Sequence, residues 1–450
     1  MHLFREAAKK VPAYQDFLKK HNIDPKSIKT IDDFKKLPIV TKENYLNLYP
    51  LEKMVWDGNL FSAYMIAGSS GATGKFYFWP RSARIDRTIP RFMSLLYTDF
   101  FDVKNKKTLV VISLALGTWA AGEICAESSR ILARNPNLPL TVITPGLDLE
   151  ETLRIVKEIG PKFEQLILIG YAAFIRDVIE KGISKGIHWE KLNTKIWTGG
   201  EGISEEWRDY ILEKISKKRD LKLILNLFTS AEAEIIGFEP PFSILIRRMC
   251  YKNPALSEVL FKSSQIPSLV QFHPLGFYIE EFNGEIIITL DSALPLVRYS
   301  IGDRGGVIYF SEMIEKLNTQ GINVKDILKE NSIERVWKLP FCFIFGRKQA
   351  VTLYAVKIYI DHIKVALEDP EIKDSNTGKF KMKSITDSTQ KQTLIIDIQL
   401  AKGIIPKDEL KIKYQNVIAK HLRKLNSEYN RLFEVKRGSN PGGEPTSLRK

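Results

Sequence analysis

The chain has 450 residues, of which 44% are hydrophobic and 27% are charged, the balance of an ordinary globular protein. That length allows two or three domains, each with a sizeable core. The formal net charge of +14 indicates an acidic partner, and the candidates are nucleotide phosphates, an acidic carrier protein, RNA or an anionic membrane.

Cysteine usage and hydropathy exclude several classes of protein. The three cysteines, Cys125, Cys250 and Cys342, lie far apart without a Cys-x-x-Cys pair. They argue against a disulfide framework or a structural zinc site and fit a reducing cytoplasm. The apolar charge-free run over residues 108–122 is shorter than the roughly 20 residues of a membrane span. We therefore expect a cytoplasmic protein with no transmembrane segment and no secretory signal.

Residues 1–55 predict a helical lead-in, with Thr41 as the N-cap of a short helix. From residue 62 the pattern changes to apolar runs that alternate with amphipathic stretches, which predicts a sheet covered by helices. The predicted strands are 62–67, 75–79, 108–114, 140–146, 165–170, 195–200, 223–228, 285–289 and 305–310. The predicted helices between them include 148–159, 172–181 and 204–217.

The last 105 residues form a different unit, with a border near residues 346–348. A strand and helix over 350–369, a strand over 392–401, a basic helix over 407–432 and a strand over 433–438 predict a small α+β domain. Residues 346–450 hold 21 Lys/Arg and 12 Asp/Glu, a net charge of +9. Without a clear nucleic-acid motif, a solvated basic face is the favoured interpretation of this charge.

Residues 67–80 read AGSSGATGKFYFWP, in which small and hydroxyl residues lead to a glycine, a lysine and an aromatic run. Phe76 stands where a Walker phosphate loop needs Ser or Thr, and the glycine spacing is also wrong. The residues after Lys75 predict a strand, so no helix N-terminus would receive a phosphate. We interpret the segment as strand–loop–strand, and its loop as either a phosphate-binding loop or a polar hairpin without a ligand.

Residues 69–75, Ser-Ser-Gly-Ala-Thr-Gly-Lys, resemble the Ser-Ser-Gly-Thr-Thr-Gly-Lys loop of the adenylate-forming superfamily. This family includes acyl-CoA synthetases, adenylation domains and luciferases. Four further segments resemble its motifs in the expected order: WTGGEGISEEWRD (197–209), NLFTSAEAE (226–234), GEIIITLDSALPLVRYSIGDRGG (284–306) and FGRKQAVTLYAVKIYIDHIKVAL (345–367). Residues 11–50 look like the opening of the phenylacetate–CoA ligase-like branch, so the resemblance covers nearly the whole chain.

The resemblance implies an α/β fold with a large N-terminal domain, residues 1–345, whose β-sheets are covered by helices. A small mobile α+β domain, residues 346–450, would follow a hinge near 346–349, at Lys348 or Gln349. The implied enzyme is an ATP-dependent acid–thiol ligase, which joins a carboxylic acid to AMP with release of pyrophosphate. It then transfers the acyl group to a thiol.

The same motifs imply roles for individual residues. The β- and γ-phosphates of ATP would be held by the loop residues Ser69, Ser70, Gly71, Thr73, Gly74 and Lys75. The adenine would be bordered by Gly199, Gly200, Glu201 and Phe228. Because Ala231 replaces the family's Thr or Ser, Thr229 or Ser230 would contact the α-phosphate instead.

The remaining roles concern the metal, the ribose and the reacting carboxylate. Glu232 would bind Mg²⁺, a hard cation that prefers oxygen ligands, and Asp303 would accept hydrogen bonds from the ribose hydroxyls. Arg347 would contact ribose or phosphate, whereas Arg298 would contact phosphate or form a structural ion pair. Lys450 is the candidate for the family's C-terminal lysine, which bridges the carboxylate and the α-phosphate; together with Lys75 and Glu232 it makes up the predicted catalytic set.

The substrate and the acceptor stay open at this point. Trp119, Tyr171 and Phe174 would line an acyl pocket for an aromatic or apolar acid. The family's CoA ligases have glycine where Ala355 stands, and this departure leaves the acceptor open. It is CoA, an acidic carrier protein or an amine. Ala72 and Ala231 each replace a hydroxyl residue, so a degenerate nucleotide-binding homologue without turnover also stays open, as does a homodimer.

Overall fold

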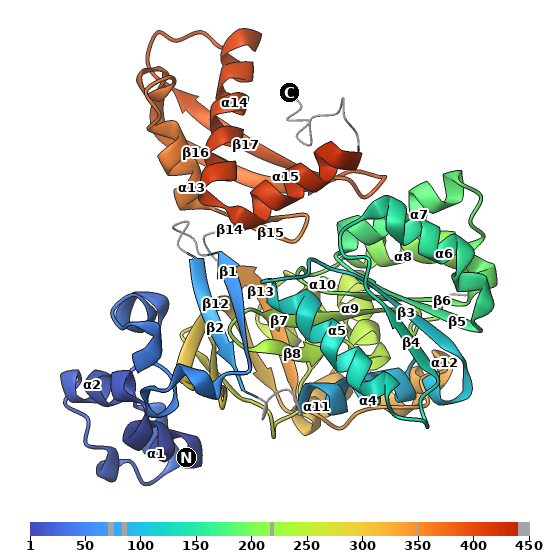
Figure 1. Ribbon diagram of the computed structural model, residues 1–450, viewed down its shortest axis with the longest axis horizontal. Helices are drawn as coiled ribbons and strands as arrows, with labels where there is room; N and C mark the ends of the chain where they lie inside the picture. The colour runs from blue at the N-terminus through green and yellow to red at the C-terminus, as the bar shows by residue number, and fades with distance from the viewer. Residues whose placement is uncertain (71–75, 83–87, 217–219, 348–349, 440–450) are drawn as a thin grey trace.

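The computed structural model describes residues 1–70, 76–82, 88–216, 220–347 and 350–439 (Figure 1). The chain begins with the helices α1 (His2–Lys10), α2 (Pro12–Lys20) and α3 (Ile31–Lys35), followed by a short helical turn, Lys42–Leu46. The Thr41 hydroxyl accepts a hydrogen bond from the Asn44 backbone N–H at 3.2 Å, which confirms Thr41 as an N-cap. The cap sets the start of the turn, and with it the position of Lys42.

An antiparallel hairpin follows the lead-in. Its strands are β1 (Met65–Ser70) and β2 (Phe76–Arg81), which pair from Met65↔Arg81 to Ser70↔Phe76. The predicted strand–loop–strand is confirmed for both strands, whereas residues 71–75 between them lie outside the described residues.

The main sheet has eleven strands in the order β10-β11-β12-β13-β9-β8-β7-β6-β5-β3-β4. The half of the sheet from β4 to β7 is parallel, and helices connect its strands. The elements of this half are α4 (Thr88–Asp99), β3 (Thr108–Ser113), α5 (Ala120–Ala133), β4 (Leu140–Ile143), α6 (Leu149–Glu158), β5 (Gln165–Gly170), α7 (Ala172–Ser184), β6 (Thr194–Thr198), α8 (Glu205–Ile215) and β7 (Ile224–Ser230).

Helices cover both faces of this parallel half. On β3, Leu109 and Val111 pack into a core with α6, α7 and α8, whereas Val110 and Ile112 pack into another core with α4 and α5. This division follows from the alternation of side chains along a strand. It explains why β3 and β5 are apolar at nearly every position, as expected for parallel strands buried on both faces.

The second half of the sheet is antiparallel. Its elements are β8 (Glu234–Phe238), α9 (Pro241–Lys252), α10 (Pro254–Phe261), β9 (Ser268–Gln271), β10 (Tyr278–Phe282), β11 (Glu285–Leu290), β12 (Leu296–Ile308), α11 (Phe310–Thr319), α12 (Val324–Glu330) and β13 (Phe341–Arg347). Strands β12 and β13 lie side by side, and the end of β13, at Arg347, lies beside Asp303 in the middle of β12.

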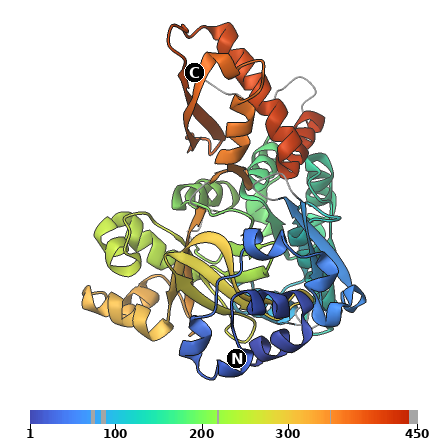
Figure 2. The ribbon, with the colours of Figure 1, turned by 90° about the vertical axis from the view of Figure 1, so that its left-hand side faces the viewer.

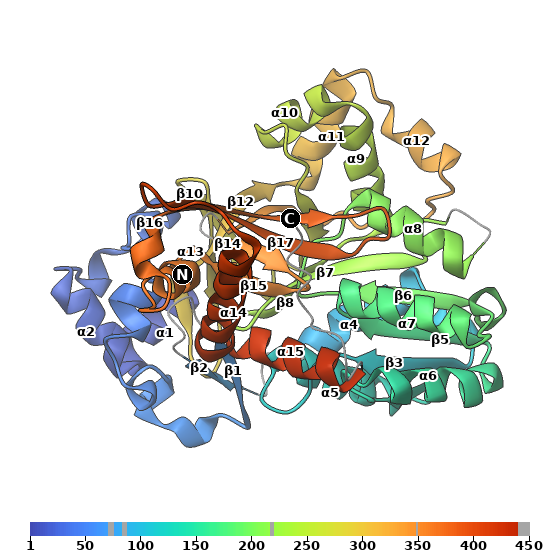
Figure 3. The same cartoon turned by 90° about the horizontal axis from the view of Figure 1, so that it is seen from above.

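The C-terminal part stands above that edge of the sheet as a lobe with its own core (Figures 1 and 2). It comprises β14 (Ala350–Leu353), β15 (Val356–Tyr359), α13 (Ile360–Leu367), β16 (Asn376–Thr386), β17 (Gln392–Leu400), α14 (Asp408–Leu425) and α15 (Ser427–Ser439). Seen from above, α15 runs from this lobe toward α5 (Figure 3). The mixed α/β fold class predicted from the sequence is confirmed.

One predicted element is wrong. The strand expected over 433–438 is part of the helix α15, and the basic helix expected over 407–432 is broken at Asn426. The Asn426 side chain accepts a hydrogen bond from the Tyr429 backbone N–H at 3.0 Å and so caps a new helix. Tyr429 and Leu432, three residues apart, then both face the core of the lobe, and this helical spacing outweighs the alternating pattern of the following residues.

Among the residues that the structure describes, no helix combines the length and apolar character needed to span a bilayer.

Candidate functional site

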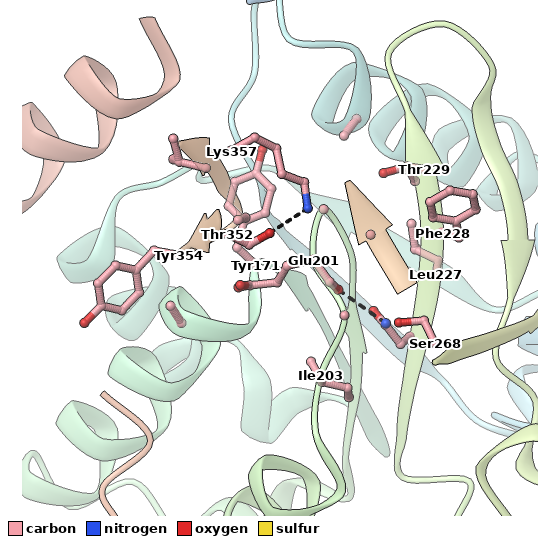
Figure 4. A pocket seen from close by; sticks show the side chains of 18 of the residues that line it. Tyr171, Glu201, Ile203, Leu227, Phe228, Thr229, Ser268, Thr352, Tyr354 and Lys357 are labelled. Carbon is pink, nitrogen blue, oxygen red and sulfur yellow. Dashed lines mark hydrogen bonds between the residues drawn. The ribbon is translucent and has the colours of Figure 1, made fainter. Parts of the chain in front are cut away.

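A cavity of about 1010 Å³ lies between the carboxyl ends of the parallel strands and the C-terminal lobe (Figure 4). Residues that follow β3, β5, β6 and β7 form one wall, and residues of β14, β15 and α15 form the opposite wall. Open α/β sheets bind their ligands at this edge, because loops at the carboxyl ends of neighbouring strands converge there.

Most of the predicted site residues that the structure describes meet at this cavity. Its lining includes Ser69, Trp119, Tyr171, Phe174, Gly200, Glu201, Phe228, Thr229, Ser230, Glu232, Asp303 and Arg347. Gly199, which directly precedes Gly200, does not line the cavity. Ser70 ends β1, while Gly71, Thr73, Gly74, Lys75 and Lys450 lie outside the described residues, as do Ala72 and the hinge candidates Lys348 and Gln349.

Glu232 is enclosed by positive charge in the turn between β7 and β8. Its side chain is only 3% exposed, and the Lys42 ammonium lies 3.0 Å from its Oε1 atom. Burial acts to raise the pKa of Glu232, but Lys42 and Arg347 outweigh it and lower the pKa to about 2. The carboxylate is therefore ionised at neutral pH.

Arg81, at the end of β2, ties the hairpin to the turn that carries Glu232. Its guanidinium forms an ion pair with Glu234 at 2.8 Å and donates hydrogen bonds to the carbonyls of Ala231 and Glu232. The side chain is 1% exposed, so these bonds are made without competition from water. Arg81 thus fixes the backbone beneath the Glu232 carboxylate.

Asp303 and Arg347 face each other across β12 and β13. They are direct partners in the register, and Arg347 Nε lies 3.9 Å from Asp303 Oδ1. Burial raises the pKa of Asp303, and the nearby Arg347 and Lys357 partly offset that rise. Arg347 also donates a hydrogen bond to the Tyr359 hydroxyl, so it joins the sheet to β15 of the C-terminal lobe.

A tight turn of the lobe meets the loop that follows β6. Tyr354 and Ala355, between β14 and β15, both have positive φ angles of 51° and 68°, which non-glycine residues rarely adopt. The Tyr354 backbone N–H donates to Gln392 Oε1 at 2.6 Å, and Gln392 Nε2 lies 3.4 Å from Glu201 Oε2. Burial raises the pKa of Glu201, and the Ala355 N–H and Gln392 partly offset the rise.

Lys357 on β15 extends from the lobe into the cavity (Figure 4). Its ammonium donates a hydrogen bond to Thr352 Oγ1 at 2.8 Å. Burial lowers the pKa of Lys357, and the negative charge of Asp303 partly offsets that fall.

Aromatic side chains line the part of the cavity nearest α5 and α7. Trp119 precedes α5, Tyr171 precedes α7, and Phe174 lies in the first turn of α7. The Arg431 guanidinium of α15 lies 5.9 Å from the centre of the Trp119 ring, close enough for a cation–π contact. This side of the cavity is suited to an aromatic or apolar group.

The residues that line the cavity also indicate how a magnesium ion could be held there. Mg²⁺ keeps several waters and usually binds one or two carboxylates together with substrate phosphates. Glu232 offers one ionised carboxylate to the cavity, while no cluster of three or more His, Cys, Asp or Glu side chains able to hold a metal occurs among the described residues. The site therefore fits an ion held jointly by Glu232 and a nucleotide, and not a metal held by protein alone.

Sequence reasoning missed several residues of this site. Lys42 lines the cavity and Arg81 supports the turn that carries Glu232, and both take these places only through tertiary structure. In the sequence, Lys42 is only a lysine after the Thr41 cap, and Arg81 is only an arginine at the end of an apolar strand. Arg298, by contrast, does not line the cavity: it forms an ion pair with Glu280 at 2.7 Å and donates to the Leu37 carbonyl. Of the two roles considered for Arg298, the structure shows the ion pair.

Comparison with known proteins was made for both sequence and structure. No family model matches the sequence, and no curated protein matches it. Among solved structures, the chain is similar to 2-hydroxyisobutyryl-CoA ligase in complex with 2-HIB-AMP and CoA in the thioesterification state. The TM-score is 0.64 at 12% identity, over 95% of this chain and 83% of the ligase.

Two further structures of the same ligase are less similar. An open conformation with 2-HIB-AMP and CoA gives a TM-score of 0.53 at 13% identity, over 95% of this chain and 88% of the other. The postadenylation state with 2-HIB-AMP gives 0.51 at 13% identity, over 95% and 83%. The chain therefore has the fold of an adenylate-forming ligase.

Proposed function

We propose that the protein activates a carboxylic acid with ATP and Mg²⁺, forming an acyl-adenylate and pyrophosphate, and then transfers the acyl group to CoA. The observation that carries the proposal is the composition of the cavity. It combines an ionised carboxylate for a metal-bound nucleotide, Glu232, and a second carboxylate for ribose, Asp303, with an aromatic wall that includes Trp119. A nucleotide and an apolar acid can thus occupy the same cavity.

In the first step a carboxylate oxygen of the acid attacks the α-phosphorus of ATP. An O–P bond forms, the bond between the α-phosphorus and the bridging oxygen to the β-phosphate breaks, and pyrophosphate leaves. Catalysis of such a step depends on positioning and on neutralising phosphate charge. Arg347 and Lys42 supply fixed positive charge at the cavity wall, Asp303 orients the ribose, and Mg²⁺ bound with Glu232 would neutralise phosphate charge.

In the second step the thiol sulfur attacks the acyl carbon, the acyl–phosphate bond breaks, and AMP leaves. The C-terminal lobe closes the cavity in the structure, and the TM-score is higher for the thioesterification state of the similar ligase, 0.64, than for its postadenylation state, 0.51. This difference supports an arrangement of the two parts that serves acyl transfer.

We assign residues 1–345 to the ATP- and acyl-binding domain and residues 346–450 to a small mobile domain. The separate core of the lobe and the positive φ of Gly346, 82°, support a hinge near 346–349. The aromatic wall supports an aromatic or apolar acid, and on the sequence resemblance we place the enzyme in the phenylacetate–CoA ligase-like branch, acting in the cytoplasm.

The test is a screen for pyrophosphate release with ATP, Mg²⁺ and a panel of acids headed by phenylacetate, with and without CoA. The proposal predicts acid-dependent release, followed by AMP release and thioester formation only with CoA. If pyrophosphate is released but CoA causes no AMP release and no thioester formation, the acceptor is a carrier protein or an amine. Nucleotide binding without release under any condition would identify a homologue without turnover and contradict the proposal.

A further inference from the structure

Lys357 differs from the other cations of the cavity in its partners. Its ammonium makes one hydrogen bond, to Thr352 Oγ1, and within the described part of the chain no carboxylate oxygen lies within the 4.0 Å of an ion pair. An ammonium has three N–H donors and no acceptor, so two donors remain for a ligand. The side chain is partly buried at the cavity wall, and a cation with two unfilled donors there is suited to bind an anion.

The position of Lys357 is set from both sides of its strand. Its backbone carbonyl accepts a hydrogen bond from Asn426 Nδ2 at 3.0 Å, at the junction of α14 and α15. On the other side, the turn at Tyr354 and Ala355 is tied through Gln392 to Glu201. The ammonium is therefore held at the cavity by the arrangement of the lobe and not by a carboxylate partner.

The surrounding charges place Lys357 at the nucleotide end of the cavity. Asp303 is the carboxylate that acts most strongly on it, followed by Glu201 and Glu428, and Arg347 acts on it as a like charge. Asp303 is the proposed ribose-binding residue. In an adenylate the phosphate follows the ribose directly, so a cation beside Asp303 lies within reach of the phosphate.

We infer that Lys357 is a catalytic residue of acyl transfer, whose ammonium binds the phosphate oxygens of the acyl-adenylate and stabilises AMP as the leaving group. The thiol loses its proton to solvent, the sulfur forms a bond to the acyl carbon, and the bond from that carbon to the phosphate oxygen breaks. The electron pair stays on AMP, whose phosphate gains the negative charge that Lys357 neutralises. The inference rests on the proposed function.

The experiment separates the two half-reactions. Acid-dependent exchange of pyrophosphate into ATP measures adenylation, and single-turnover reaction of a prepared acyl-adenylate with CoA measures transfer. The acid is phenylacetate or, if another member of the panel gives faster exchange, that acid. The variants are Lys357→Met and Lys357→Arg, and the control is Lys383→Met, which removes an exposed lysine from β16 of the same lobe.

Lys357→Met is expected to slow acyl transfer about 100-fold, the effect of removing one oxyanion donor, while exchange stays within about twofold. Lys357→Arg should recover part of the loss, and Lys383→Met should match the wild type. Equal losses in both half-reactions, or no loss in transfer, would overturn the inference. If Lys357→Met does not fold, the same comparison is made with Lys357→Gln and Lys357→Arg. Absence of exchange in the wild type would instead overturn the proposed function, and the inference with it.

Discussion

Two lysines reach the cavity from opposite ends of the chain, and their surroundings differ. Lys42 comes from the N-terminal lead-in and lies 3.0 Å from Glu232, whose backbone is held by Arg81. Lys357 comes from the C-terminal lobe, and among the described residues its ammonium donates a hydrogen bond to the Thr352 hydroxyl without forming an ion pair. Removing the cation from a pair with a buried carboxylate leaves an uncompensated charge, whereas a partly buried cation with no ion-pair partner is available to a ligand. The lysine from the large part is thus already paired before a ligand binds, whereas the lysine from the lobe still has donors for a ligand.

The largest expected effect concerns Arg81, which holds the backbone beneath Glu232. Replacing Arg81 by Met removes a buried ion pair with Glu234 and the buried hydrogen bonds to two carbonyls, and we expect the free energy of unfolding to fall by about 3–5 kcal/mol. Chemical denaturation measures the change. The control is Arg154→Met, which breaks an exposed pair with Glu151 and should leave stability nearly unchanged. Equal effects of the two substitutions would show that Arg81 does not support the turn.

The second prediction tests the comparison itself. Lys42→Met leaves the buried Glu232 without its nearest cation and should lower the free energy of unfolding by about 3 kcal/mol. Lys357→Met removes a partly buried charge that forms no ion pair within the described residues, so it should change the free energy of unfolding much less. Denaturation of both variants at pH 7 decides between these expectations. A larger loss of unfolding free energy for Lys357→Met than for Lys42→Met would contradict the difference between the two lysines.

The third prediction concerns pH. The pKa of Glu232 is about 2 in the folded protein, below the ordinary value of 4.5, so its contribution to stability is full above pH 4.5 and is lost as the pH falls toward 2. Wild type should therefore lose about 2 kcal/mol more than Glu232→Gln between pH 6 and pH 3. Urea denaturation across that range measures the difference. Parallel pH dependence of the two proteins would contradict the depressed pKa.

The smallest expected effect concerns the turn between β14 and β15, which directly precedes the strand of Lys357. Ala355 has a φ of 68°, so Ala355→Gly should relieve strain and raise the free energy of unfolding by about 0.5–1 kcal/mol. Ala419→Gly, in the interior of α14, should instead lower it by a similar amount. Paired denaturation curves give both values. Destabilisation by Ala355→Gly would mean that the alanine methyl group has a packing role.

Much of the fold could be predicted from the sequence because its signals are local. Apolar runs over 108–114 and 165–170 predicted strands that the structure has as β3 and β5, and Thr41 caps its turn as predicted. The strand predicted over 433–438 failed because the packing of Tyr429 and Leu432, and not the local alternation of residues, decides that segment.

The site was predicted unevenly for the same reason. Glu232, Asp303 and Arg347 stand in segments that resemble family motifs, and the structure places all three at the cavity. Lys42 and Arg81 are ordinary charged residues in the sequence. Their partners, Glu232 and Glu234, are more than 150 residues away in the chain, so no local pattern could connect them.

The central claim is that a carboxylate attacks the α-phosphorus of ATP in this cavity. The most direct measurement is a reaction of ¹⁸O-labelled phenylacetate, or the acid that the panel identifies, with ATP, Mg²⁺ and CoA, followed by mass spectrometry of the products. The account predicts one ¹⁸O atom in each AMP formed, because the attacking oxygen stays with the phosphate when the acyl group leaves. AMP without the label, or label in inorganic phosphate instead, would contradict it.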